Sequence, residues 1–150
     1  MRRVAIFSFG CAFLLLSACL TLAGEVKSGV VKQSNKTTIQ DPVALGQMWL
    51  TTVDQGKYDK SWEMASTYLK SMVTKEQWMQ TMSGRGSLGA LVSRNLKEKQ
   101  YFTSLPGAPD GEYYVLTFNT VMKNKAVAVE TLTLMQDKDG QLRAAGYFIK

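Results

Sequence analysis

The chain has 150 residues, of which 45% are apolar, 20% charged and 10% aromatic, and its formal net charge is +6. This length and composition suit one globular domain and exclude a fibrous or wholly disordered protein. The sequence has no histidine, and both cysteines, Cys11 and Cys19, precede residue 24. The rest of the chain therefore has no Ser-His or Cys-His nucleophile pair and no zinc site of the usual nitrogen and sulfur ligands.

Residues 1–23 have the plan of a secretory signal peptide. The first three residues carry two arginines, Val4 to Leu16 is apolar apart from Ser8 and Gly10, and small residues follow. This apolar run is shorter than the roughly 20 residues of a membrane-spanning helix. We therefore expect the protein to be exported.

Two cleavage positions are open. Residues 16–19, LSAC, match the lipobox of bacterial lipoproteins, in which Cys19 is acylated and becomes the first residue. Leu20 differs from the aspartate that usually retains lipoproteins in the inner membrane. The alternative is ordinary cleavage after Ala23, with Thr21 as the other small residue. We favour lipidation at Cys19, which predicts a periplasmic protein anchored in the outer membrane.

Residues 24–40 form a polar segment without a sustained period, and we expect a flexible tether. Without Arg2 and Arg3 the chain has 16 basic and 12 acidic residues, a net charge of +4. The tether's lysines would favour the anionic headgroups of a membrane to which the protein is anchored. The interspersed charges and the expected export argue against a nucleic-acid partner.

A single domain is expected from residue 41 to residue 150, and it begins with helices. Asp41 is a suitable N-cap, Pro42 suits the first helical position, and Gly56 suits the C-terminal end, which predicts a helix over 42–55. Residues 58–72 continue a helical period that Ser66 and Thr67 divide into two short pieces.

A capping box announces the next helix, because Thr74 is followed three residues later by Gln77. We expect it to run to about Ser83 and to stop in GRGSLG, where Arg85 is interpreted as part of a helix stop rather than a phosphate cradle. The tryptophans fall on predicted helix faces and are expected in the core: Trp49, Trp62 and Trp78.

After Gly89 the apolar period changes from about 3.6 to 2. Four strands are predicted, at 90–104, 112–122, 126–136 and 142–149, and their short connections require antiparallel pairing. Helices followed by strands predict an α+β fold, with N-terminal helices on one face of a curled four-stranded antiparallel sheet. Nuclear-transport-factor-2-like and cystatin-like cones share this layout, and we rank the first ahead of the second.

Two glycines are assigned local roles. Gly146 in the last strand predicts a bulge or bend. In the connection between the first two strands, Pro109, Asp110 and Gly111 have turn chemistry, and Gly111 is expected to take the positive φ. We interpret that connection as a turn rather than a site.

The domain also resembles a known family. The segments WLTTVDQGKYDKSWEMAS, TKEQW, GALVSRNL, SLPGAPDGEYYVLTF and AVETLTLMQDKDGQLRAAGYFIK are similar, in their order and spacing, to the bacterial exported family catalogued as domain of unknown function 4019. The resemblance covers residues 41–150. It implies an exported small α+β domain and brings no assigned activity or catalytic residue.

Without histidine and cysteine in the domain, an active site in a pocket would have to use carboxylates and tyrosines. A buried carboxylic acid with a raised pKa could transfer a proton, or a tyrosine hydroxyl could donate a hydrogen bond to a developing oxyanion. The candidates are Asp54, Tyr113, Tyr114, Glu130 and Tyr147. Glu130 is the most informative, because alternation places it on the strand face of Ala128 and Leu132. The competing interpretation is a solvated Glu130, or one paired with Arg94 or Arg143 across the sheet.

These observations favour an exported cell-envelope protein with a non-catalytic binding or accessory domain. Its expected partner is an envelope protein or a small apolar ligand, and no cofactor or metal is expected because no nucleotide-binding signature or metal-ligand pattern occurs. The alternative is a small pocket enzyme of isomerase or hydratase type that uses a carboxylate and a tyrosine.

Overall fold

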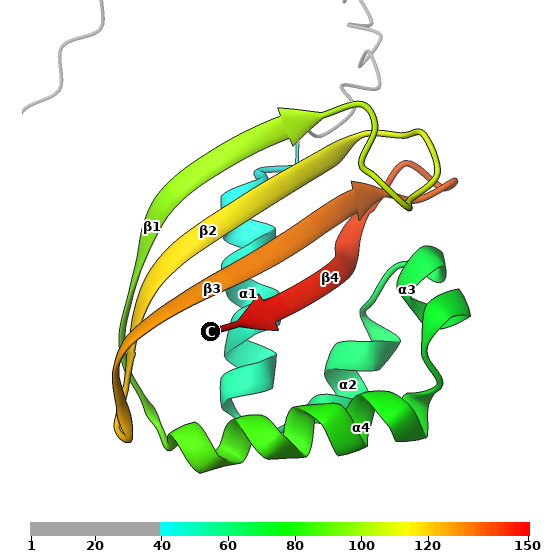
Figure 1. Cartoon of the computed structure of the whole chain (residues 1–150). Coiled ribbons are helices and arrows are strands. Elements are labelled where there is room, and N and C mark those ends of the chain that lie inside the picture. The colour runs from blue at the N-terminus through cyan, green and yellow to red at the C-terminus, as the bar shows by residue number, and fades with distance from the viewer. Residues whose placement is uncertain (1–39) are drawn as a thin grey trace, which may run out of the picture. The chain divides into compact units, whose positions relative to one another are not determined.

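Helices precede a four-stranded antiparallel sheet in the computed structural model, which describes residues 40–150 (Figure 1). The predicted signal peptide 1–23, the lipidation at Cys19 and tether residues 24–39 lie outside this range. The elements are α1 (Pro42–Asp54), α2 (Tyr58–Glu63), α3 (Thr67–Met72), α4 (Lys75–Ser83), the 3-10 helix η1 (Gly84–Leu88), β1 (Leu91–Phe102), β2 (Tyr113–Met122), β3 (Lys125–Gln136) and β4 (Leu142–Ile149).

The predicted caps position the longer helices. Asp41 Oδ1 accepts a hydrogen bond from Val43 N at 3.1 Å, which starts α1. In α4, Thr74 Oγ1 accepts from Gln77 N at 3.2 Å while Gln77 Oε1 accepts from Thr74 N at 2.9 Å, so the capping box is complete.

The predicted break between α2 and α3 has a clear cause. Ser66 Oγ accepts from Leu69 N at 3.1 Å and caps α3, while Ser66 N donates to Ala144 O of β4 at 2.8 Å. Ala65 and Ala144 also form an isolated parallel bridge. The linker between the two short helices therefore covers part of the β4 edge of the sheet.

The sheet has the order β1-β2-β3-β4, with every neighbouring pair antiparallel. Irregularities in register interrupt β1 near Val92 and Lys97, and β4 at Ala145, next to Gly146. Such bulges bend strands and increase their twist, so they account for the curl of the open sheet (Figure 1). The predicted α+β fold and curled sheet are confirmed; the closer likeness to a nuclear-transport-factor-2-like or cystatin-like cone stays a prediction.

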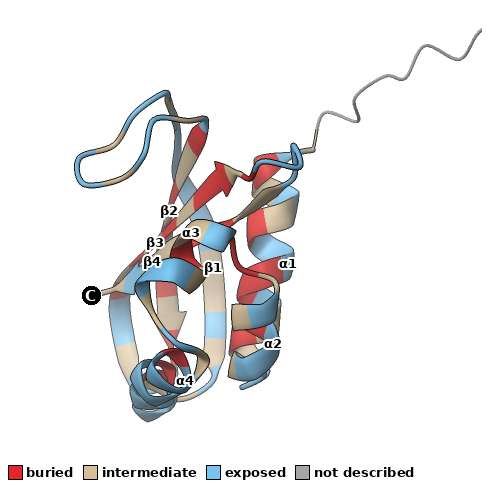
Figure 2. Cartoon of the chain, turned by 90° about the vertical axis from the view of Figure 1, so that its right-hand side faces the viewer, coloured by how far each residue is buried: buried red, intermediate tan, exposed pale blue. Residues whose placement is uncertain are grey.

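The core lies between α1 and the inner face of the sheet, and buried residues form a stripe along α1 (Figure 2). Gly46 allows the close approach, because a Cβ there would lie 2.6 Å from Leu116 Cδ1 and 3.1 Å from Leu132 Cδ2. Both leucines are completely buried.

Two of the tryptophans close the core beside α2. Trp49 and Trp78 have ring centroids 5.9 Å apart. Trp49 Nε1 donates to Ser61 O at 2.9 Å, and Trp78 Nε1 donates to Ser61 Oγ at 3.0 Å. Both rings are buried, as expected, whereas Trp62 is only partly buried.

The connection between β1 and β2 packs on a second, smaller hydrophobic cluster, which we call the second cluster. Leu105 and Ala108 contact a group that includes Tyr113 and Met135. The positive φ of this connection belongs to Gly107, at 78°, so the prediction that Gly111 takes it was wrong. Gly107 O accepts a hydrogen bond from Tyr68 of α3 at 2.9 Å, which fixes the turn to the helices.

The chain is held at the first described residue, because Leu142 N of β4 donates to Gln40 Oε1 at 2.9 Å. Among residues 40–150, no helix combines the length and hydropathy needed to cross a bilayer.

Candidate functional site

Charged side chains from distant parts of the sequence meet inside the domain. The end of α1 supplies an aspartate, η1 and β1 each supply an arginine, and β2, β3 and β4 supply a threonine, a glutamate and a tyrosine. We call this group the ionic cluster, and its members are Asp54, Arg85, Arg94, Thr120, Glu130 and Tyr147.

Glu130 is the centre of the ionic cluster and is 0% exposed. Its Oε2 accepts from Arg94 Nε at 2.5 Å and from Thr120 Oγ1 at 2.8 Å. Its Oε1 accepts from Tyr147 OH at 2.6 Å, Arg94 Nη2 at 3.1 Å and Arg85 Nη2 at 3.2 Å. Five donors thus use the roughly four lone-pair sites of the carboxylate, which leaves no site for another proton donor.

Asp54 bridges the same two arginines from the helical side. Its Oδ1 accepts from Arg85 Nη2 at 2.5 Å and Arg94 Nη2 at 3.0 Å, and its Oδ2 accepts from Arg94 Nη1 at 2.7 Å. Two carboxylates and two guanidinium groups make the ionic cluster electrically neutral, as buried charges require.

Opposing effects set the pKa of Glu130. Burial would raise it, but hydrogen bonds from Arg94 and Tyr147 and the charge of Arg94 lower the pKa from its ordinary value of 4.5 to about 2. The carboxylate is therefore ionised at neutral pH. The enzymatic alternative requires a buried acid with a raised pKa, whereas the pKa of Glu130 is lowered.

Tyr147 connects Glu130 to Arg85. Its hydroxyl accepts from Arg85 Nε at 2.8 Å and donates to Glu130. Burial and the adjacent Glu130 carboxylate raise the pKa of this phenol, so it stays protonated at neutral pH. The ring packs against Trp49, with centroids 5.7 Å apart.

Local structure explains why these side chains converge. The β1–β2 register places Arg94 opposite Thr120, and strand alternation keeps Glu130 and Tyr147 on the same inner face. The turn of η1 directly after α4 brings Arg85 beneath that face.

A cavity of about 320 Å³ adjoins the ionic cluster between α4, η1 and the end of β4. We call it the α4–β4 cavity. Arg85 is the one charged residue of its lining within the described part of the chain and, with Tyr147, belongs also to the ionic cluster. The other lining residues are Trp78, Thr81, Met82, Gly84, Leu88, Phe148 and Ile149.

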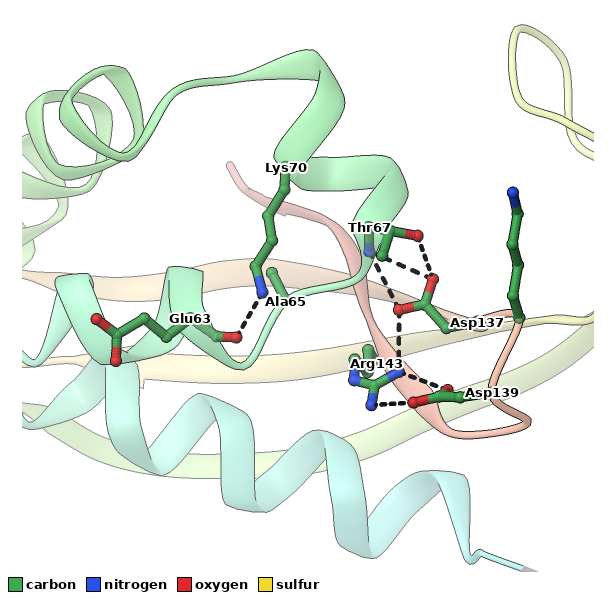
Figure 3. A pocket seen from close by; sticks show the side chains of 8 residues that line it. Glu63, Ala65, Thr67, Lys70, Asp137, Asp139 and Arg143 are labelled. Atoms are coloured by element: carbon green, nitrogen blue, oxygen red, sulfur yellow. Dashed lines mark hydrogen bonds and ion pairs between the residues drawn. The ribbon is translucent and has the colours of Figure 1, made fainter.

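A second cavity, of about 390 Å³, lies beside the β3–β4 turn (Figure 3). Asp137 at its wall accepts from Thr67 Oγ1 at 2.7 Å and Arg143 Nη1 at 3.0 Å, and Arg143 Nη2 bonds Asp139 at 2.6 Å. Lys70 Nζ donates to the backbone O of Glu63 at 2.6 Å. These groups largely satisfy one another, so this cavity shows no single ligand chemistry.

Three of the five predicted candidates meet in the ionic cluster: Asp54, Glu130 and Tyr147. The other two lie elsewhere. Tyr113 donates to Pro109 O at 2.5 Å in the second cluster, and Tyr114 packs against Tyr101 with ring centroids 5.2 Å apart.

Arg85 was not among the predicted site residues, although it links the ionic cluster to the α4–β4 cavity. Glu130 pairs with Arg94, one of the two partners weighed from the sequence, whereas Arg143 pairs with Asp137 and Asp139. Thr120 also escaped notice, although its position opposite Arg94 in the predicted hairpin was a usable signal. Within residues 40–150, no group of three acidic, histidine or cysteine side chains is arranged to hold a metal ion.

The family described as "Protein of unknown function (DUF4019)" matches residues 45–147. The chain belongs to this family. The match spans every residue of this DUF4019 domain's ionic cluster, from Asp54 to Tyr147. No curated protein and no solved structure matches the chain.

Proposed function

We propose that this DUF4019 protein is an exported cell-envelope protein whose domain binds a small apolar molecule without transforming it. The α4–β4 cavity carries the proposal. Its volume of about 320 Å³ is at the lower end for small-molecule sites, and a mainly apolar lining with a few convergent polar groups is typical of them. The signal-peptide pattern of residues 1–23 supports the export.

The state of Glu130 favours binding over catalysis. A general acid must hold a proton near the working pH, and a general base must reach the substrate's proton. Glu130 is ionised, completely buried and already bonded by five donors. Its role is therefore to hold Arg85, Arg94 and Tyr147 in place.

Trp78 offers a direct test, because it lines the α4–β4 cavity while Trp62 does not. In NMR spectra of the purified protein, 4-phenylbutanol at millimolar concentration is expected to shift the Trp78 indole N–H and the methyl groups of Leu88 and Ile149. The Trp62 indole is the internal control. Unchanged Trp78, Leu88 and Ile149 signals with both this alcohol and the corresponding acid, 4-phenylbutyrate, would contradict the proposed cavity.

The enzymatic alternative has one observation in its favour, the 2.6 Å hydrogen bond between Tyr147 and Glu130. A small isomerase or hydratase would pair such groups, and Tyr147 lines the cavity. Turnover of a small carbonyl compound that is lost in a Tyr147→Phe variant would establish this alternative. Activity unchanged in that variant, or absent, would count against it.

Anchoring by lipid remains part of the proposal. Acylation at Cys19 would hold the domain at the periplasmic face of the outer membrane, with residues 24–39 as a spacer. Cells grown with a radioactive fatty acid are expected to label the protein, and Cys19→Ala is expected to abolish the label. A mature chain that begins at Gly24 would instead support a free periplasmic protein.

A further inference from the structure

The guanidinium group of Arg85 is only partly used by the ionic cluster. Nε donates to Tyr147, and Nη2 donates to Asp54 and Glu130. No described residue accepts a hydrogen bond from Nη1. Every fully buried side-chain nitrogen or oxygen in residues 40–150 has a hydrogen-bond partner. Because Nη1 has no such partner among these residues, they do not enclose it fully.

Arg85 and its charged partners differ in whether they line the α4–β4 cavity. The carboxylate partners Glu130 and Asp54 are not among the residues that line the cavity, and their side chains are 0% and 15% exposed. Among residues 40–150, Arg85 is the sole charged residue of the lining. Among the described lining residues, a ligand in the α4–β4 cavity would therefore meet one cationic side chain and no carboxylate side chain, although the ionic cluster is neutral as a whole.

The lining also specifies the uncharged part of a ligand. Trp78, Leu88 and Ile149 provide aromatic and aliphatic surface next to the guanidinium group. The C-terminal end of α4 also lies at the cavity, and its dipole opposes an anion. A charge-assisted hydrogen bond from arginine is the stronger of the two effects, because the effect of a helix dipole at an exposed end is small and screened.

We propose that the α4–β4 cavity binds a small monocarboxylate with an apolar body, its carboxylate on Arg85 Nη1 and its body against Trp78, Leu88 and Ile149. This inference rests on the proposed binding function and names the class of ligand. The cavity volume of about 320 Å³ favours a short aryl or branched-alkyl acid over a long-chain acid.

A matched pair of probes tests the carboxylate. 4-Phenylbutyrate and 4-phenylbutanol share the apolar body and differ in the group presented to Arg85. With the purified exported protein at pH 7, the carboxylate is expected to bind at least about tenfold more tightly, as followed by the Trp78, Leu88 and Ile149 signals. Equal affinities would overturn the proposed ligand class and leave the binding function standing, whereas no binding of either probe would overturn both.

Substitution of Arg85 would break the ionic cluster, so the charge of the cavity is better changed at its rim. Thr81 lines the cavity and is exposed on α4. Relative to 4-phenylbutanol, Thr81→Glu is expected to weaken 4-phenylbutyrate binding about threefold, and Thr81→Lys to strengthen it about threefold. The same two changes at Thr51, exposed on α1 and outside the lining, are the control and should have little effect.

The Thr81 and Thr51 variants also test the location. If both threonines change carboxylate affinity equally, or neither does, the carboxylate does not lie beside Arg85 and the proposal is wrong. Laurate extends the test to ligand length. Laurate binding tighter than 4-phenylbutyrate would overturn the assignment to a short acid.

Discussion

Replacing Glu130 by glutamine is the most direct test of the ionic cluster. The two side chains have nearly the same size, so the change creates no cavity. It removes the charge that balances Arg85 and Arg94 and turns an acceptor oxygen into an NH₂ group that faces their N–H groups. One buried positive charge is then left without a counterion.

The expected loss of stability follows from two independent arguments. Removing one partner of a buried ion pair costs about 3 to 5 kcal/mol, because the other charge stays buried without compensation. The lowering of the Glu130 pKa from 4.5 to about 2 corresponds to about 3 kcal/mol of stabilisation at neutral pH. We therefore expect Glu130→Gln to lower the free energy of unfolding by about 3 to 5 kcal/mol.

The assay is urea unfolding at pH 7, followed by tryptophan fluorescence. Glu98→Gln is the matched control, because Glu98 is exposed on β1 and the same chemical change there should alter the free energy of unfolding by less than about 0.5 kcal/mol. A loss below about 1 kcal/mol in Glu130→Gln would refute the buried-cluster reasoning.

The pH dependence gives a second readout of the same substitution. Folding lowers the pKa of Glu130, so its stabilisation is complete above about pH 4.5 and is lost as the pH falls toward 2. The wild-type protein should lose about 3 kcal/mol more than Glu130→Gln across this interval. Parallel stability curves for the two proteins would contradict the lowered pKa.

Three further substitutions test the fold, each by urea and thermal unfolding. Gly46→Ala should destabilise by about 1 to 3 kcal/mol, because its Cβ would lie 2.6 Å from Leu116 Cδ1. The control Gly84→Ala, whose Cβ meets nothing within 4 Å, should stabilise the protein by about 0.5 to 1 kcal/mol. Equal effects of the two alanine substitutions would show that the Leu116 side chain moves aside at no cost. Thr74→Ala should cost about 1 kcal/mol through loss of the α4 N-cap, and an unchanged midpoint would argue against the capping box. Asp137→Ala should cost about 1 to 3 kcal/mol, because it removes the acceptor of bonds from the start of α3 and from β4, and a smaller loss would mean that water replaces them.

Local sequence signals predicted the elements well, because their causes are local. The capping box of α4 lies within four residues, and the break at Ser66 follows from a side chain that caps α3 three residues ahead. Alternation along β3 likewise placed Glu130 on the buried face with Leu132. These features need no knowledge of distant partners.

The ionic cluster depends on contacts between residues that are distant in the sequence. Short-range sequence patterns do not predict such contacts. Arg85 contacts residues 31, 45 and 62 positions away in the sequence. The segment GRGSLG by itself is typical of a helix stop and gives no sign of these contacts. Gly107 is a smaller example, since either glycine of the β1–β2 connection could take a positive φ and the contact with Tyr68 favours Gly107. Glu130 was identified from the sequence, but its pKa depends on two arginines that the fold brings to it.

The ionic cluster is poorly explained by stability alone, because apolar residues of similar volume often stabilise a core as well as a buried ion pair does. What such residues could not do is hold a guanidinium group in one orientation. Bonds from Nε and Nη2 to Tyr147, Asp54 and Glu130 fix the plane of Arg85, so Nη1 needs no reordering when a ligand binds. Protonation of Glu130 in the folded protein, which requires the pH to fall toward 2, would weaken this support, and a carboxylate on Nη1 would in turn stabilise the folded state by binding to it alone. Acid stability and ligand affinity are therefore expected to change together, since both depend on how firmly Arg85 is held.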